Sequence, residues 1–366
     1  MKPVVAITVG DYNGIGPEII LKSISRRAIH RTCTPILVGP ASAFLFYARR
    51  LKLKVELLPV SIDYKDAHDI KQTLAYRRSP VLLIPLVESS QLPRSAISPG
   101  KTSAKAGNAA ARAIEEAVCL AKAGIARAIV TAPVSKKAMH RARVNFPGQT
   151  EMLQHLTGSP RVAMMLVSRT MRVGLVTIHV PIRKIPKTLS RQLVRERIKT
   201  IHEALITDWR IRKPKVAVLG LNPHAGEEGD LGTEDKILIK PVIKQMRATN
   251  MNVDGPFPAD SFFGSYAPGR FDAIIAMYHD QGLIPLKMSS FGKGVNVSVG
   301  LPIVRTSPDH GTAFDIAGKG IANPGSMIEA IKLAAQIAKN RGLTTNNKRS
   351  DGSGSQSRKL HRRTKK

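Results

Sequence analysis

Three histidines follow apolar runs that are typical of buried strands, and they are the first candidates for chemistry in the sequence. His179 closes MRVGLVTIHV, His224 follows KVAVLGLNP, and His279 follows FDAIIAMY. A single histidine at a strand end is more often a cap or a core residue than a ligand. Three neutral imidazoles with an open fourth position, however, form a catalytic site for a divalent cation, zinc-like by ligand type. The sequence therefore predicts a metal site at His179, His224 and His279.

Acidic residues accompany two of these histidines. The loop LNPHAGEEGDLGTED around His224 is dense in glycine and carboxylates, which suits close approach to a ligand and orientation of an imidazole. The alternative is that this loop is a surface connection before a helix. Glu234 and Asp235 would then lie in the first turn of that helix, where negative charge interacts favourably with the helix dipole. Asp280 directly follows His279 and is interpreted as an orienting group rather than as a base.

Polar residues that would suit an anionic substrate lie beyond His279. Lys287 follows an apolar patch, Asn296 lies in GKGVNVSVG, and Arg305 lies in GLPIVRTS. Each alone is more often a surface residue. Fixed cations near a metal would nevertheless suit a substrate that bears a carboxylate or a phosphate.

The elements that must position these residues alternate between strand and helix along the whole chain. Strands are expected at VVAITVG, PILVGP, VLLIPL, ARAIVTAPV, KVAVLGLNP, FDAIIAMYHD and GVNVSVG, and a hairpin at 161–168 and 171–180. Helices are expected at 102–124, 188–208, 234–249 and SMIEAIKLAAQIAK, and a Gln-Gly turn after His279. This rhythm predicts an α/β fold with mostly parallel sheets, helices on both faces and antiparallel insertions.

The opening GDYNGIGPE reads as a tight turn from a strand into a helix, with Pro17 in the first helical turn. It does not match the GxGxxG dinucleotide fingerprint.

No linker separates domains, so the chain is expected to cross between two domains more than once. We place a first α/β domain at 1–128 plus 299–340, a second with the three histidines at 129–298, and a disordered basic tail at 341–366.

Composition restricts the classes of protein that remain. The net charge is +31, with part of it in the tail, which is either a solvated extension or a tether for a polyanion such as nucleic acid. Aromatic residues are only 4%, too few for the stacking platforms of single-strand binders. We expect no signal peptide at MKPVVAITVGD, and no apolar run is long enough to span a membrane. Cys33 and Cys119 are expected to be buried thiols of a cytoplasmic protein.

Together these motifs resemble the 4-hydroxythreonine-4-phosphate dehydrogenases of pyridoxal phosphate biosynthesis. The resemblance runs from about Val4 to Asn340 and rests on the following segments: GDYNGIGPEI, TAPVSKKAM, PGQTEML, TIHVPIRKI, LNPHAGEEGDLGTED, AMYHDQGLIPLK and FGKGVNVSVGLPIVRTSPDHGTAFDIAGKGIANPGS. The DHGTAFDIAGKGIANP segment also resembles the adenosine-side loop of isocitrate and isopropylmalate dehydrogenases.

The resemblance implies a homodimer of two-domain, isopropylmalate dehydrogenase-like subunits with the active site in the cleft between domains. The family's metal histidines correspond to His179, His224 and His279, and the last reaches across the dimer interface. The substrate contacts correspond to Gln149, Thr150, Lys287, Asn296 and Arg305, and the residues near NAD to His310, Thr312, Asp315 and Asn323. Zn²⁺, Mg²⁺ or Co²⁺ would fill the metal site.

Two segments depart from the family's pattern. This chain reads GQTE with Gln149 where the family usually has GHTE, and GDYNGIGPE where GDPAGIGPE is usual. Glutamine donates and accepts hydrogen bonds, but it cannot titrate near neutral pH or carry a positive charge. The binding of an anion would survive this change, whereas handling of a proton at this position would not.

These observations support three hypotheses for function. The first is oxidation of 4-phosphohydroxy-L-threonine by NAD⁺ with help from a divalent cation, giving a 3-keto acid that loses CO₂ to form 3-amino-2-oxopropyl phosphate. The second is a dehydrogenase of 4-phospho-D-threonate or 4-phospho-D-erythronate in the catabolism of sugar acids. The third, from another class, is a basic nucleic-acid-binding protein without catalysis.

Overall fold

The computed structural model describes residues 2–60 and 82–352, with side chains up to residue 342. One twelve-stranded sheet forms its centre, with the strand order β3-β4-β2-β1-β5-β12-β11-β6-β7-β10-β8-β9. Neighbouring strands are parallel except in the middle, where β12–β11, β11–β6 and β6–β7 are antiparallel. The prediction of a mixed α/β fold with a mostly parallel sheet, antiparallel insertions and a β6–β7 hairpin is confirmed.

The strands are short and mostly buried on both faces, which explains why they read as continuous apolar runs. Their bounds are β1 (Val4–Thr8), β2 (Thr34–Val38), β3 (Val55–Pro59), β4 (Leu82–Val87), β5 (Ala128–Thr131), β6 (Ala163–Val167), β7 (Arg172–Leu175), β8 (Lys215–Leu219), β9 (Asn252–Phe257), β10 (Ala273–Ala276), β11 (Val295–Val299) and β12 (Arg305–Pro308).

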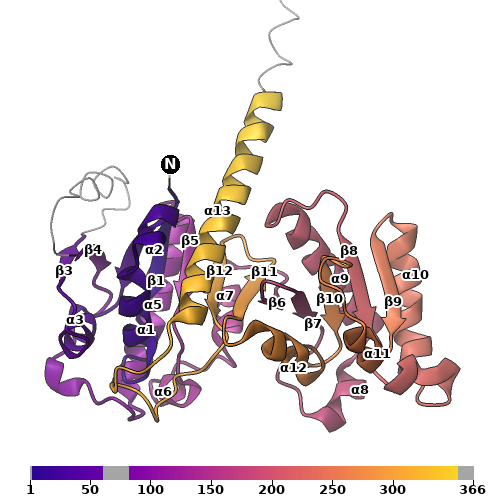
Figure 1. Ribbon diagram of the computed structural model, residues 1–366, viewed down its shortest axis with the longest axis horizontal. Coiled ribbons are helices and arrows are strands. Elements are labelled where there is room, and N and C mark those ends of the chain that lie inside the picture. Colours follow the sequence, from indigo (N-terminus) through magenta and orange to yellow (C-terminus); the bar gives the residue numbers. More distant parts are fainter. Residues whose placement is uncertain (1, 61–81, 353–366) are drawn as a thin grey trace, which may run out of the picture.

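Helices cover the sheet and α13 stands between its two halves (Figure 1). The α-helices are α1 (Gly16–Ile24), α2 (Arg27–Thr32), α3 (Ala41–Arg50), α5 (Ala104–Lys122), α6 (Lys136–Arg141), α7 (Gln149–Thr157), α8 (Ile185–Thr188), α9 (Arg191–Thr207), α10 (Lys240–Ala248), α11 (Ala259–Gly264), α12 (His279–Ser290) and α13 (Gly325–Gly352). Short helical segments lie at η1 (Arg94–Ala96), η2 (Ile182–Lys184), η3 (Pro223–Gly229) and η4 (Asp235–Ile239). No helix of the described chain is both long and apolar enough to cross a bilayer.

The alanine-rich helix predicted at 102–124 is confirmed as α5. It begins after Ser103, whose Oγ accepts a hydrogen bond from the N–H of Ala106 at 3.1 Å. Its small residues allow close packing, because a Cβ at Gly107 would lie 2.1 Å from the carbonyl oxygen of Ala138 on α6. The segment after β5, which includes α6, is therefore packed closely against α5.

The Gln-Gly turn expected after His279 was wrong, because these residues lie inside α12. Gly282 is needed there for close packing against the sheet, since a Cβ would lie 2.5 Å from Cγ1 of Val173. Gln281 connects two strand ends: its Oε1 accepts from the N–H of Met277 at 2.7 Å, and its Nε2 donates to the carbonyl of Gly220 at 2.6 Å. His279 is thus the first residue of a helix, fixed by its neighbours.

Two further sequence predictions were wrong in detail. Cys33 is buried but Cys119 is exposed, because it lies on the outer face of α5. The helix predicted at 234–249 is divided into the π-helical turn η4 and α10, which has Pro241 in its first turn. Proline lacks an N–H for the helical ladder, so it favours a new start at this point.

The last helix extends to Gly352, beyond the segment that was expected to end it. Arg341 explains part of this continuation, because its guanidinium donates to both carboxylate oxygens of Asp208, at 2.6 and 3.0 Å, and to the carbonyl of Leu301. The remainder of the predicted basic tail, 353–366, with the expected polyanion contact, lies outside the described residues. The predicted domain boundaries stay a prediction, since the strands of both expected domains join one sheet.

Candidate active site

Three adjacent parallel strands bring the candidate metal histidines to one edge of the sheet. β10 pairs with β7 on one side and β8 on the other, so the carboxyl ends of all three meet there. Beyond the strands, Thr177 still donates from its backbone N–H to Met277 at 3.1 Å. His179 and His279 each lie two residues further, and their ring centroids are 5.8 Å apart. We call His179, His224 and His279 the histidine edge.

Within the histidine edge, the surroundings of His279 and His179 suit metal ligands. Nδ1 of His279 lies 2.7 Å from Oδ1 of Asp280, an arrangement that fixes the ring and leaves Nε2 available. Partial burial lowers the pKa of His179, and the positive charge of Lys136 adds to the effect. A lowered pKa favours the neutral imidazole that binds a metal ion.

No ring contact joins His224 to the other two histidines in the described chain, and His224 is held by an unusual backbone. His224 to Glu228 all have positive φ angles between 40° and 80°, so five consecutive residues form a left-handed turn. L-residues adopt this conformation at a cost of about 1–2 kcal/mol each. Asp235 stabilises the segment that leads into the turn, because its two carboxylate oxygens accept the N–H groups of Leu221 and Asn222 at 2.8 and 3.0 Å.

The structure of the single chain therefore joins two of the three predicted metal histidines. No group of three His, Cys, Asp or Glu side chains in the described chain is close enough to hold a metal ion. The donor chemistry of the His179–His279 pair fits a divalent cation such as zinc, which requires at least one further ligand.

Next to the histidine edge is a cavity of about 200 Å³, which we call the arginine cavity. The predicted site residues that line it are Gln149, Thr150, His179, Asn296, Arg305 and His310, and the unpredicted Lys136, Glu151 and Ser307 line it too. The cavity therefore brings four of the five substrate-contact candidates together with one member of the histidine edge. An anion and a metal ion bound there would lie side by side.

Arg305 is the central cation of this cavity and is only 2% exposed. Four hydrogen bonds of its guanidinium go to neutral oxygens: Thr131 Oγ1 at 2.7 and 3.1 Å, Ser298 Oγ at 3.0 Å and Gln149 Oε1 at 3.0 Å. Burial lowers its pKa to about 10, so the group remains charged at neutral pH. The negative charge of Glu151 acts against this effect, but Arg305 has no ion pair in the described chain. A buried charge without such a pair is costly and favours the binding of an anion.

Two buried polar atoms that face this region have no hydrogen-bond partner among the described residues. They are Oδ1 of Asn296 and Nε2 of His310. Nδ1 of His310 lies 3.1 Å from the carbonyl of Gly311, which accounts for the other ring nitrogen. Unpaired buried polar atoms next to a buried cation indicate a place for a polar ligand.

The structure does not place Lys287 in the arginine cavity. Lys287 is exposed on α12, with its Nζ 4.0 Å from Oδ1 of Asp309. Burial raises the pKa of Asp309, whereas the nearby charge of Lys287 acts in the opposite direction. This pair lies beside His310, so Lys287 is near the cavity but not part of its lining.

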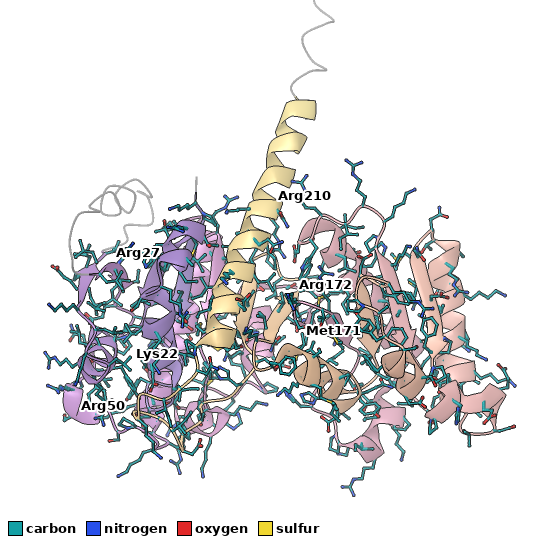
Figure 2. All side chains as sticks on the ribbon, viewed as in Figure 1. Lys22, Arg27, Arg50, Met171, Arg172 and Arg210 are labelled. Atoms are coloured by element: carbon teal, nitrogen blue, oxygen red, sulfur yellow. The ribbon has the colours of Figure 1, made fainter. Side chains whose placement is uncertain are left out.

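The predicted cofactor loop packs against the opening turn of the chain. The N–H of Ile15 donates to the carbonyl of Thr312 at 3.0 Å, and a Cβ at Gly14 would lie 2.8 Å from that same oxygen. Lys22 and Arg50, labelled in Figure 2, donate to carbonyls of residues 318–322. Asp315 and Asn323 are exposed, and the Oδ1 of Asn323 accepts from Gly325 N. His310, Thr312, Asp315 and Asn323 thus border one loop, and the free Nε2 of His310 fits a polar cofactor.

The unusual residues of GDYNGIGPE have structural roles at this turn. Tyr12 is fully buried, and Asn13 connects the turn to the segment before α5 through Ser98 N and Lys101 O, both at 2.8 Å. Neither residue lines the arginine cavity, so this departure from the family pattern affects the scaffold rather than the site.

Sequence reasoning missed two of the three neutral anchors of Arg305, namely Thr131 and Ser298. Thr131 ends β5, a position that the rule applied to the histidines would have marked. Ser298 lies two residues after Asn296 on β11, and period-two alternation places both on one face of the strand. Its Oγ also lies 3.3 Å from Oγ1 of Thr150.

Comparisons with known proteins show the family of this chain. Residues 31–334 match the family model described as pyridoxal phosphate biosynthetic protein PdxA. The chain is 42% identical to a 4-hydroxythreonine-4-phosphate dehydrogenase from Trichlorobacter lovleyi, covering 93% of this chain and 99% of the relative. It is 41% identical to a D-threonate 4-phosphate dehydrogenase from Cupriavidus necator, covering 93% and 98%. The crystal structure of a 4-hydroxythreonine-4-phosphate dehydrogenase from Klebsiella pneumoniae matches with a TM-score of 0.80 at 37% identity, covering 92% and 98%.

Proposed function

Because this chain belongs to the pyridoxal phosphate biosynthetic protein PdxA family, we propose that it oxidises 4-phosphohydroxy-L-threonine with NAD⁺. Hydride would pass from the hydroxyl-bearing carbon to NAD⁺ and the hydroxyl proton to solvent. The resulting 3-keto acid would lose CO₂ and take up a proton to give 3-amino-2-oxopropyl phosphate. The observation that carries this proposal is the buried Arg305, hydrogen-bonded to neutral oxygens alone, in a cavity that His179 also lines.

The substrate phosphate binds at the arginine cavity. Arg305 offers a planar fork of donors that matches a phosphate, and Thr150 adds a hydroxyl at the start of α7. The free N–H groups at the start of this nine-residue helix favour negative charge as well. Oδ1 of Asn296 accepts a hydrogen bond from the substrate, which explains why it has no protein partner.

His179, His224 and His279 hold the divalent cation, Zn²⁺ or, failing that, Mg²⁺ or Co²⁺. When bound, this ion supplies Lewis-acid stabilisation of negative charge on the substrate oxygen as hydride leaves. Asp280 fixes the ring of His279, and Lys136 next to His179 favours its neutral form. The histidine edge and Arg305 together orient the reacting carbon towards the nicotinamide.

NAD binds along the loop that carries His310, Thr312, Asp315 and Asn323. The support for this placement is the unpaired Nε2 of His310 at the cavity and the contact of Thr312 with Gly14 in the opening turn. The cofactor would then lie on the same side of the sheet as the substrate, within reach of the carbon that loses hydride.

We place this reaction in a homodimer whose subunits share the metal site. One chain brings two of the three histidines together, and three large apolar side chains lie exposed along α12 and just after it: Ile284, Met288 and Phe291. Such a patch is typical of an interface. Lys287 on the same helix then contacts the substrate from a position that a single chain leaves outside the cavity.

Mixed dimers test the shared site. Subunits with His279→Ala and subunits with His224→Ala are each inactive as homodimers, but a co-refolded mixture should regain NADH formation. If His279 and His224 come from different subunits, one of the two sites in each heterodimer retains both residues. A mixture that stays inactive, while wild-type protein refolds with full activity, contradicts sharing between these two residues.

The reaction itself is tested by NADH formation from 4-phosphohydroxy-L-threonine, with and without a chelator. We expect turnover that stops with the chelator and returns with added zinc. A second candidate substrate is 4-phospho-D-threonate, since a 41% identical relative is named for it. A higher kcat/KM for 4-phospho-D-threonate or 4-phospho-D-erythronate would replace the first candidate, while the metal-dependent oxidation would stand.

A further inference from the structure

Gln149 connects the central cation of the arginine cavity to the protein backbone. Its Oε1 accepts from Nη2 of Arg305 at 3.0 Å, and its Nε2 donates to the carbonyl of Ala132 at 3.2 Å. The chemistry of these partners fixes the orientation of the amide. A guanidinium only donates and a carbonyl only accepts, so the flipped amide would lose both hydrogen bonds.

The amide has one hydrogen-bonding group left over. Glutamine has an oxygen acceptor and two N–H donors, of which one N–H is used by Ala132. The second N–H has no protein acceptor in the described chain, and Gln149 lines the arginine cavity at the start of α7. It is therefore available to a ligand beside the guanidinium of Arg305.

No other neutral side chain of similar length offers the same three groups. A neutral histidine has one acceptor and one donor, so it can bind Arg305 and then either Ala132 or the ligand, but not both. A glutamate accepts from Arg305 but has no donor, and its charge would neutralise the guanidinium. The acceptors Thr131, Ser298 and Gln149 are neutral and leave the charge of Arg305 without an ion pair in the described chain. The carboxylate of Glu151 in the same cavity acts on Arg305 electrostatically but accepts no hydrogen bond from it.

We propose that Gln149 is a positioning residue that sets substrate affinity by fixing Arg305 with a neutral oxygen while donating its spare N–H to the substrate phosphate. The identity of the anion as a phosphate rests on the proposed function, whereas the arrangement of Gln149 and Arg305 does not. Gln149 acts on binding and not on proton transfer, so its loss raises KM and leaves kcat within about threefold.

Three substitutions separate this role from simple packing. Gln149→Met keeps the length and loses all hydrogen bonds, so the Kd for inorganic phosphate should rise roughly 10- to 100-fold. Gln149→His keeps the acceptor and one donor and should lose less. Gln149→Glu has nearly the shape of glutamine but neutralises Arg305, so its loss of phosphate affinity should exceed that of Gln149→Met.

Gln154 provides the matched control on the same helix. Its Nε2 also donates to a backbone carbonyl, that of Ser159 at 3.1 Å, but it does not line the arginine cavity. Gln154→Met and Gln154→Glu should leave phosphate affinity and KM unchanged. Thermal melting of all five variants identifies any substitution that affects the fold.

Calorimetry with inorganic phosphate, together with KM and kcat for 4-phosphohydroxy-L-threonine, measures the outcome. The expected order of phosphate affinity is wild type, Gln149→His, Gln149→Met and then Gln149→Glu. A glutamate variant that binds phosphate as well as wild type overturns the proposal, because a packing role tolerates that change. If the order holds but no NADH forms from the substrate, the proposed reaction fails and the role of Gln149 stands.

Discussion

The arginine cavity and the histidine edge lie side by side but differ in how complete they are in one chain. The cavity has its cation, the neutral anchors of that cation and unpaired polar atoms, all from a single subunit. The histidine edge has two rings 5.8 Å apart and a third on a left-handed turn of its own. The groups proposed to bind an anion are thus assembled within one chain, whereas those proposed to bind a metal ion are not.

Because of this difference, we expect that single substitutions can change the affinity for phosphate without changing the affinity for metal, and the reverse. Arg305 is held by side chains packed in the middle of the sheet, where positions are fixed by strand register. His224 depends on a loop whose conformation is costly for L-residues. Substitutions at one region are expected to leave the binding function of the other largely intact.

The largest expected effect comes from removing a member of the histidine edge that does not line the arginine cavity. His279→Ala should lower NADH formation by roughly 10³-fold or more, because several kcal/mol of charge stabilisation are lost. Phosphate affinity, measured by calorimetry, should change less than about threefold. His30→Ala on α2, in the other half of the sheet, is the control. Loss of phosphate binding in His279→Ala would show that the histidine edge and the arginine cavity do not bind their ligands independently.

The converse substitution is Arg305→Met. Truncating a buried charged partner typically costs about 2–5 kcal/mol of binding free energy, so kcat/KM should fall roughly 30- to 4,000-fold. Zinc content, measured by mass spectrometry of the metal, should stay that of wild type. Arg305→Lys should restore little, because an ammonium cannot reproduce the fork of hydrogen bonds to Thr131, Ser298 and Gln149. Full rescue by lysine would mean that only charge matters at this position.

The sequence predicted these two regions unequally, for physical reasons. Strands, the hairpin and α5 follow from apolar runs and alternation, which burial in a parallel sheet requires. The histidine edge was visible because strand ends meet at one edge, but the separation of His224 depends on backbone angles that no pattern of side chains encodes. The Gln-Gly turn was wrong because Gly282 serves packing against Val173, a contact between segments far apart in sequence. The end of β5 could have indicated Thr131, but nothing in the sequence distinguishes Ser298 from an ordinary strand residue. The role of both residues becomes visible only from their hydrogen bonds to Arg305.

The third prediction concerns the left-handed turn of the histidine edge. Asp235→Ala removes the acceptor for two backbone N–H groups, so the free energy of unfolding should fall by about 2–4 kcal/mol. Affinity for zinc should fall roughly 10- to 100-fold, as for other residues that orient metal ligands. Asp230→Ala, at an exposed acid in the same loop, is the control. Unchanged zinc affinity in an Asp235→Ala protein that still folds would remove His224 from the metal site.

A smaller effect is expected at the packing of α12, which carries His279. Gly282→Ala should cost about 1–3 kcal/mol of unfolding free energy, because the added Cβ would lie 2.5 Å from Val173 Cγ1. Gly264→Ala, at the end of α11, meets nothing within 4 Å and should change stability by less than about 1 kcal/mol. Chemical denaturation measures both. Equal effects of the two substitutions would mean that α12 is free to move away from the sheet.

The smallest expected effect concerns Asp11, a second buried ionisable group in the half of the sheet that contains Arg305. The prediction tests whether its charge lowers the free energy of unfolding. Asp11 is fully buried, its Oδ2 has no partner in the described chain, and its backbone N–H donates to the carbonyl of Pro133, which lines the arginine cavity. Burial raises the pKa of Asp11 from its ordinary value of 3.8 to about 6, against a smaller opposite effect of the hydrogen bond from the N–H of Asn13. Between these two pH values the native state binds a proton that the unfolded state has released.

The free energy of unfolding therefore falls as the pH rises from about 4 to 6, and above pH 6 the ionised carboxylate costs up to about 3 kcal/mol. Asp11→Asn removes this cost, so it should stabilise the protein at pH 7.5 and have little effect at pH 4, as measured by urea denaturation. Asp230→Asn, at an exposed acid, should show no such dependence on pH. A stability difference for Asp11→Asn that is the same at both pH values would mean that this carboxyl is not held in its protonated form. Among Asp11 and Arg305, a cost of buried charge would then be particular to Arg305, as expected if only Arg305 binds the substrate.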